Sequence, residues 1–209
     1  MVAVPVALKG DNLIVYFALA AFYHDPALKV RRIFLSDIRW LIYQNDHSDN
    51  NNKIKEAMEY LIENGYIYCE ANSKYWDLDV EHSFKNVTKE QYVLVAPDEF
   101  TAICHSDMKN RFILFQIFVA ILSTVDARVR YGKWSRESIA QRAGVNVKTL
   151  EHAFTILSDM QLIYFKNSVY DHVANQCLTS TYGRYIDRDL IRHIAAVRKL
   201  DTINNGDYN

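Results

Sequence analysis

The feature that most constrains the fold is an internal repeat, because the second half of the chain resembles the first at a spacing of 96 to 99 residues. A repeat of this length indicates one structural unit that occurs twice; the alternative is that two helical units of similar length fall into partial register. The spacing drops by three residues between Ser36 and Ala57, which places an insertion in the polar run 45–52. The matched segments are Asn12–Ala21 with Asn110–Val119, Leu28–Arg31 with Ala127–Arg130, Ser36 with Ser135, Ala57–Leu61 with Ala153–Leu157, and Ile67–Tyr68 with Ile163–Tyr164.

Each copy begins with the pattern of three helices. An apolar helix is expected first, over 13–22 or 112–122, followed by a short basic extended piece over 29–34 or 128–134. A serine then stands where an N-cap opens a second helix. Apolar residues at i, i+4 and i+7 predict one buried stripe on the third helix of each copy. These serines are Ser36 and Ser135, and the stripes are Ile54, Met58 and Leu61 in one copy and Leu150, Phe154 and Leu157 in the other.

A β-hairpin is expected to follow the third helix in each copy. Gly65 is placed to end the first of these helices in a left-handed conformation. An aromatic and β-branched run follows, over 66–69 or 162–165, and in the first copy a turn at Asn72–Ser73 leads into a returning strand over 75–80. Three helices and a hairpin make a winged helix. The sequence therefore predicts a mainly α fold with small β-wings (α+β), as two winged-helix domains in tandem plus a C-terminal helix.

The expected domain boundaries follow from this layout. The first winged-helix domain covers 1–90, a connector covers 91–108, the second domain covers 109–180, and a C-terminal helix with a tail covers 181–209. The periodicity predicts the last helix over 185–200, either packed on the second domain, forming a dimer seam or adding phosphate contacts. The polar end, 201–209, is expected to fray.

The most specific motif lies in 136–155, and this stretch resembles the helix-turn-helix of DNA-binding proteins nearly position for position. Ala140 is small where the second helix crosses above the first. Gly144 stands where the turn needs a positive φ, and Val145 is expected to pack inward. Leu150 and Ala153 would bury the following helix. The resemblance implies a helix that lies in the major groove of DNA; winged helices reused as protein-docking modules are the alternative.

Charge is concentrated around this motif, although the whole chain carries a net charge of only -1. Between Lys109 and Lys148 there are eight basic residues and two acidic ones. Arg136 and Arg142 are expected to neutralise phosphates, and the solvent face of the third helix to reach base edges. The full set of DNA-binding candidates in the second copy is Arg128, Arg130, Lys133, Arg136, Arg142, Asn146, Lys148, Thr149, His152, and, at the wing tip, Lys166 and Asn167.

The first copy is a weaker candidate for DNA contact. Its expected third helix begins with Lys53 and Lys55, and Arg39 lies on the helix before it. Glu56, Glu59 and Glu63 follow on the same third helix, and a like charge repels phosphate. The first copy is therefore expected either to touch DNA through its N-terminal turn or to serve as a partner surface.

Other classes of protein find little support in the sequence. Three cysteines without a Cys-x-x-Cys spacing predict neither a disulfide framework nor a zinc site, and indicate buried thiols in a reducing compartment. The apolar run 13–23 is too short for a membrane span. Glycine-rich phosphate loops, paired catalytic carboxylates and nucleophile triads are not recognisable. We therefore expect a cytoplasmic, non-enzymatic protein without cofactor or metal.

Tandem winged helices related by duplication resemble the replication initiators of plasmids and phages, in which one chain places both domains on a single site. The resemblance covers residues 12–200 and the second helix-turn-helix; the acidic first recognition helix departs from the pattern. It implies a sequence-specific double-stranded DNA-binding protein, acting in replication initiation or transcription regulation. The partner is expected to be duplex DNA, with a homodimer or replication proteins as further partners and no membrane. The alternative function is a protein-interaction module of a replication or primosome assembly.

Overall fold

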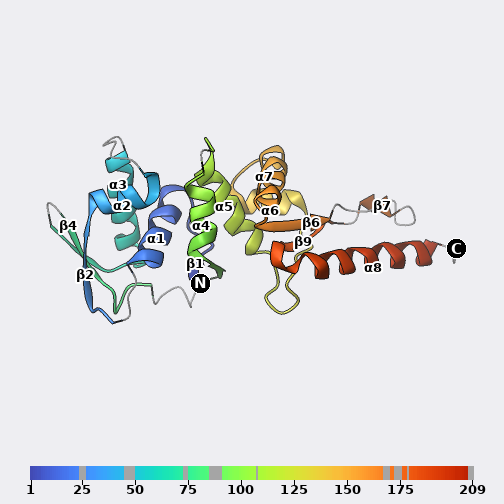
Figure 1. Cartoon of the computed structure of the whole chain (residues 1–209), viewed down its shortest axis with the longest axis horizontal. Coiled ribbons are helices and arrows are strands. Elements are labelled where there is room, and N and C mark those ends of the chain that lie inside the picture. Colours follow the sequence, from blue (N-terminus) through green and yellow to red (C-terminus); the bar gives the residue numbers. More distant parts are fainter. Residues whose placement is uncertain are drawn as a thin grey trace. The chain divides into compact units, whose positions relative to one another are not determined.

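The chain is described here from a computed structural model, traced in Figure 1. It describes residues 1–23, 27–44, 50–72, 75–84, 91–106, 108–166, 170–171, 176–177 and 179–206. Contacts between Cα atoms divide the chain into two compact units, Met1–Val119 and Ala120–Asn209, which we call unit 1 and unit 2. The described residues are mainly helical with small antiparallel sheets, which confirms the expected α+β class.

Unit 1 contains a bundle of helices on a three-stranded antiparallel sheet. The helices of the bundle are α1 (Gly10–Phe22), α2 (Leu35–Tyr43) and α3 (Asn51–Glu63), and α1 contacts both others. The strands lie in the order β2 (Val30–Phe34), β4 (Tyr75–Asp79), β3 (Cys69–Ala71) across the sheet. The central strand is therefore β4, which comes last of the three in the sequence. The predicted stripe of α3 is fully buried at Ile54, Met58 and Leu61. The sequence pattern of the third helix is thus confirmed.

A second, smaller part of unit 1 was not predicted. The stretch 91–108, expected as a connector, contains β5 (Tyr92–Val95) and α4 (Pro97–Cys104). Strand β5 pairs with β1 (Val2–Pro5) at the start of the chain. Phe100 of α4 stacks on Phe17 of α1 with ring centroids 4.7 Å apart, and Phe115 meets Phe17 edge-on at 5.3 Å. All three rings are buried, which at about 2–3 kcal/mol per large apolar side chain makes them the main anchor of this part.

Helix α5 (Arg111–Leu122) crosses the division, and unit 2 begins within its last turn. Unit 2 continues with α6 (Arg136–Ala143), α7 (Val147–Asp159) and two paired strands, β6 (Ile163–Lys166) and β9 (Thr181–Arg184). A second short pair, β7 (Tyr170–Asp171) with β8 (Gln176–Cys177), lies between them in sequence. A 3-10 turn, η3 (Tyr185–Asp187), then leads into α8 (Arg188–Gly206).

Unit 2 repeats the strand arrangement of unit 1 in a reduced form. Its piece 128–134, expected as extended, contributes a single antiparallel bridge between Gly132 and Tyr182 of β9. Strand β9 therefore lies between Gly132 and β6, as β4 lies between β2 and β3. Residues 128 and 129 form a turn instead, because Asp126 accepts the backbone N–H groups of Arg128 and Val129 at 2.7 and 3.1 Å, and the other residues of the piece have no regular secondary structure.

Some boundaries differ from expectation. Ser36 is not an N-cap: β2 runs to Phe34 and α2 begins directly at Leu35, so the hydroxyl of Ser36 lies in the first helical turn and bonds Asp37 at 3.3 Å. Strand β3 begins at Cys69 rather than at residue 66, because the Tyr66 and Ile67 N–H groups bond the Leu61 carbonyl and close the end of α3. Gly65 has a φ of 71°, as predicted.

The last helix is longer than the sequence pattern predicts. Residues 185–187 form the η3 turn, and α8 then continues to Gly206, past the expected end at residue 200. The helix thus includes residues 201–206 of the polar end. Ser73 of the expected hairpin turn and most of the proposed insertion, 45–49, lie outside the described residues.

Candidate nucleic-acid interface

The predicted helix-turn-helix is formed by α6 and α7, and local interactions fix both helix starts. Ser135 caps α6, since its hydroxyl accepts the N–H of Ser138 at 3.2 Å. Gly144 ends α6 with a φ of 68°, which glycine adopts without strain. Asn146 caps α7 through its side-chain oxygen. The turn is therefore specified by three residues whose types match their backbone roles.

The two helices pack through the apolar residues that the motif predicts. Ile139 and Ala140 of α6 are buried, and so are Leu150 and Ala153 of α7. Val145 is half-buried and its N–H bonds the Ala140 carbonyl at 3.0 Å, which holds the turn against α6. This packing directs the remaining face of α7 towards solvent.

That face carries Lys148 and His152, and both side chains are exposed. Between them in sequence is Glu151, also exposed, which forms an ion pair with Arg136 of α6. Arg136 is thus engaged by a carboxylate from the recognition helix itself. Because exposed ion pairs contribute about 0–1 kcal/mol, this pair can open at low cost when a phosphate approaches.

Two expected base-reading residues have a structural task as well. The Asn146 side-chain oxygen accepts the backbone N–H of Thr149 at 2.8 Å and its hydroxyl at 3.0 Å. A capping oxygen stabilises the helix start by about 1 kcal/mol. Asn146 therefore keeps only its amide NH₂ group for outward contacts, while Lys148 and His152 keep their full donor sets.

Arg142 lies against an aromatic ring at the end of α6. Its guanidinium carbon is 5.2 Å from the centroid of Trp134, whose side chain is 45% exposed. The backbone N–H of Trp134 donates to the buried phenol of Tyr182 at 3.3 Å, which holds the main chain at this residue. A planar guanidinium stacked on an indole is preorganised for a phosphate or a base, so Trp134 belongs with the candidate interface.

The loop between α5 and α6 does not place all of its cations near α7. Arg130 forms an ion pair at 3.0 Å with Asp187 of η3, and it has a φ of 63°. In Figure 1 this loop projects from the side of β6 and β9 opposite α6 and α7. Arg128 lies in the same turn, whereas Lys133, with its amine 5.1 Å from the ring centre of Tyr131, lies next to Trp134. Arg128 and Arg130 are thus separated from the exposed face of α7.

Lys166 is separated from α7 by the alternation of strand β6. Phe165 faces α7, where its ring meets Phe154 at 5.4 Å. Neighbouring side chains on a strand point to opposite faces, so Tyr164 and Lys166 lie on the other face. Tyr164 there accepts a hydrogen bond from Arg192 of α8 at 2.9 Å. Asn167, the other expected wing contact, lies outside the described residues.

In unit 1 the three candidates lie on α2 and α3. Arg39 donates to the Asn51 side chain at 2.9 Å and so joins α2 to the start of α3. Lys53 and Lys55 are exposed on α3, and the glutamates that follow on that helix, Glu56, Glu59 and Glu63, are all exposed as well.

The charges of the two units have opposite signs. Unit 1 contains 12 Lys and Arg against 16 Asp and Glu, a net charge of -4, while unit 2 contains 12 against 9, a net charge of +3. The near-neutral chain is therefore a sum of an acidic and a basic half. Long-range attraction of a polyanion would act on unit 2.

Neither thiol chemistry nor metal chemistry is indicated by the described residues. Burial raises the pKa of Cys69 to about 12, with Asp77 and Asp79 adding to the effect, and burial also raises the pKa of Cys104. Both thiols are therefore protonated and unreactive at neutral pH. Within the described ranges, no group of three or more His, Cys, Asp or Glu side chains is placed to hold a metal ion.

Comparisons with known proteins add nothing to the geometry of this interface. No family model, curated protein or solved structure matches the chain. Where the structure describes the chain, none of its helices combines the length and apolar character needed to cross a membrane.

Proposed function

We propose that this protein binds double-stranded DNA sequence-specifically through α6 and α7 of unit 2, as a replication initiator or transcriptional regulator of a plasmid or phage. The observation that carries the proposal is the capped helix-turn-helix whose second helix exposes Lys148 and His152. A helix of this kind fits the major groove, where a lysine donates to guanine and an imidazole donates or accepts at base edges.

The order of elements supports tandem winged helices. In both copies of the repeat a helix precedes a strand or bridge, two further helices follow, and the last strand of the hairpin returns beside the first; the leading helix of the second copy is α5, most of which belongs to unit 1. The charge of unit 2 supports DNA as its ligand. Arg136, which pairs with Glu151 of α7, and Arg142, which lies against Trp134, are the residues proposed to meet phosphates. The structure adds Trp134 to the candidate contacts.

A protein-interaction role is favoured for unit 1 rather than for the whole chain. Its candidate recognition helix carries three exposed glutamates besides its two lysines, and the unit as a whole is acidic. We therefore propose that unit 1 serves as a partner surface for a replication protein or a second copy, and that duplex recognition depends on unit 2.

Selection of bound fragments from a random duplex pool tests the proposal. Lys148→Ala and His152→Ala are expected to lose preference for the selected site over random DNA by about tenfold each, since one base contact contributes about 1–3 kcal/mol. Lys55→Ala removes the same charge from an exposed position of α3 and is expected to keep the preference. If no sequence is enriched, or if the α7 variants retain the full preference, duplex reading by α7 is refuted.

A further inference from the structure

A second cluster of cations lies in unit 2, and it is interleaved with tyrosine rings. The guanidinium carbon of Arg192 is 5.1 Å from the ring centre of Tyr164, and the Lys166 amine is 6.0 Å from the same centre. The guanidinium carbon of Arg188 is 5.2 Å from the ring centre of Tyr185. The two rings meet edge-on at 6.2 Å. These five residues come from β6, η3 and α8, and we call them the tyrosine–cation cluster.

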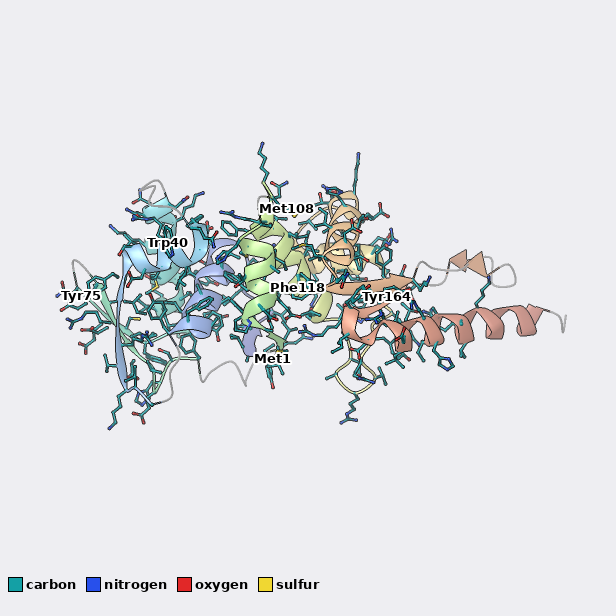
Figure 2. All side chains as sticks on the ribbon, viewed as in Figure 1. Met1, Trp40, Tyr75, Met108, Phe118 and Tyr164 are labelled. Atoms are coloured by element: carbon teal, nitrogen blue, oxygen red, sulfur yellow. The ribbon has the colours of Figure 1, made fainter. Side chains whose placement is uncertain are left out.

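The cluster lies on the opposite side of the sheet from the recognition helix. Strand β9 shows this independently of β6: Tyr182 packs its ring on Phe154 of α7, whereas Thr181 accepts a hydrogen bond from Arg198 of α8 at 2.7 Å. Helices α7 and α8 therefore cover opposite faces. Figure 1 shows α8 below β6 and β9 with α7 above them, and Figure 2 labels Tyr164 where β6 passes α8. One duplex on α7 does not reach this face.

The electrostatics of the cluster favour an anion. One of its three cations, Arg192, pairs with a carboxylate, that of Asp189, at 3.2 Å. The side chain of Asp189 is 79% exposed. Partial burial opposes ionisation of Tyr164, but hydrogen bonds from Arg192 and Lys166 outweigh it and lower the pKa of this phenol. The rings hold the cations in place while leaving them at the surface, since the side chain of Arg192 is 55% exposed.

The mixture of rings and cations narrows the kind of anion. Backbone phosphates pair with guanidinium and ammonium groups, and unstacked bases stack on tyrosine rings and on the flat faces of arginine. Ile186, between the cluster residues in sequence, is 84% exposed and adds an apolar surface for a base. Bases inside a duplex are stacked on each other and cannot use such a surface, whereas an acidic protein segment needs no rings.

We propose that the tyrosine–cation cluster binds single-stranded DNA, with phosphates at Arg188, Arg192 and Lys166 and bases stacked on Tyr185 and the adjoining guanidinium planes. Unit 2 then has two nucleic-acid surfaces, one for a duplex and one for a separated strand. The inference goes beyond the proposed function and does not depend on sequence reading by α7.

Fluorescence anisotropy with a labelled oligothymidine of about 16 nucleotides tests the inference, because this length covers the usual site sizes. Arg188→Ala and Arg192→Ala are expected to weaken binding about tenfold each at low salt and to reduce the slope of log K against log salt by about 0.7 per lost phosphate contact. Tyr185→Leu is expected to weaken binding about tenfold without changing the slope, because it removes stacking and no charge.

The matched control is Lys199→Ala, which removes one cation from the same helix outside the cluster and is expected to change affinity less than twofold. Lys148→Ala is expected to leave oligothymidine binding intact, so a failure of duplex reading is recognised separately. The inference is overturned if the parent protein does not bind oligothymidine, if Lys199→Ala weakens binding as much as Arg192→Ala, or if the cluster variants lose duplex affinity to the same extent. Circular dichroism of each variant verifies that it is folded.

Discussion

Substitution of Gly132 by alanine tests the most constrained contact of unit 2. The added Cβ would lie 2.6 and 2.7 Å from two ring atoms of Tyr182 and 2.8 Å from the carbonyl oxygen of Thr124. The ring cannot move away easily, because it is fully buried and its hydroxyl is 2.6 Å from the Thr124 hydroxyl. Gly132 and Tyr182 also exchange two backbone hydrogen bonds, of 2.8 and 3.2 Å.

The expected magnitude follows from two opposing contributions. Replacing glycine by alanine stabilises a compatible site by about 0.4–1 kcal/mol through the unfolded chain. Overpacking a core costs about 1–3 kcal/mol, and contacts this short with both a buried ring and a backbone atom belong at the upper end. We therefore expect a net loss of about 2 kcal/mol from the free energy of unfolding, a factor of roughly 30 in the ratio of folded to unfolded protein.

Hydrogen exchange measured by mass spectrometry locates this loss, since protection is expected to fall in β6, β9 and α8 and to persist in unit 1. Thermal unfolding followed by circular dichroism gives its size. Gly10→Ala is the contrasting variant: its Cβ meets no atom within 4 Å, but a φ of +57° makes alanine cost about 1–2 kcal/mol, confined to unit 1. The steric argument is refuted if the Gly132→Ala protein is as stable as the parent. It is also refuted if adding Tyr182→Leu to Gly132→Ala recovers none of the lost stability.

Two further predictions concern single side chains. Ser135→Ala is expected to lower the free energy of unfolding by about 1 kcal/mol and Ser36→Ala by a few tenths, because Ser135 caps a helix and Ser36 does not; equal losses in urea titrations would contradict the assignment. Backbone N–H groups of Val129 and Arg128 lower the pKa of Asp126, so its contribution is present above the unfolded pKa near 4 and disappears as pH falls through the lower folded value. Asp126→Ala should therefore reduce stability at pH 7 and reduce the difference in stability between pH 7 and pH 3, which acid titration of the unfolding midpoint measures.

The helices and the helix-turn-helix could be predicted because their signals are local. The stripe of Leu150, Phe154 and Leu157 is buried as the spacing indicated, and Gly144 has the positive φ that the turn requires. Capping likewise depends on residues three positions apart, which is why Ser135 was identified. Ser36 was misread because a strand runs directly into α2, and sequence spacing alone does not show where a strand ends.

The elements that were missed depend on contacts distant in sequence. Strands β1 and β5 are each four residues long and pair across some ninety residues, from Val2 with Val95 to Pro5 with Tyr92. For the interface, formal charge identified candidate cations but not their environment: Arg130 pairs with Asp187, and Lys166 lies on the face away from α7. The sequence does contain aromatic residues close to basic ones, at 131–134 and 164–166. This pattern is the one that could have predicted rings packed against the cations.

Helix α5 has a consequence for dissecting the protein into fragments. Its ring at Phe115 meets those of Phe17 and Phe100, and the fold of unit 1 thus includes residues beyond the expected boundary at 108/109. A polypeptide ending at residue 108 would leave two large aromatic side chains uncovered and prone to aggregate. Fragments intended to separate the two proposed activities need to retain the whole of α5 with the N-terminal piece, and point substitutions disturb the fold less than truncation.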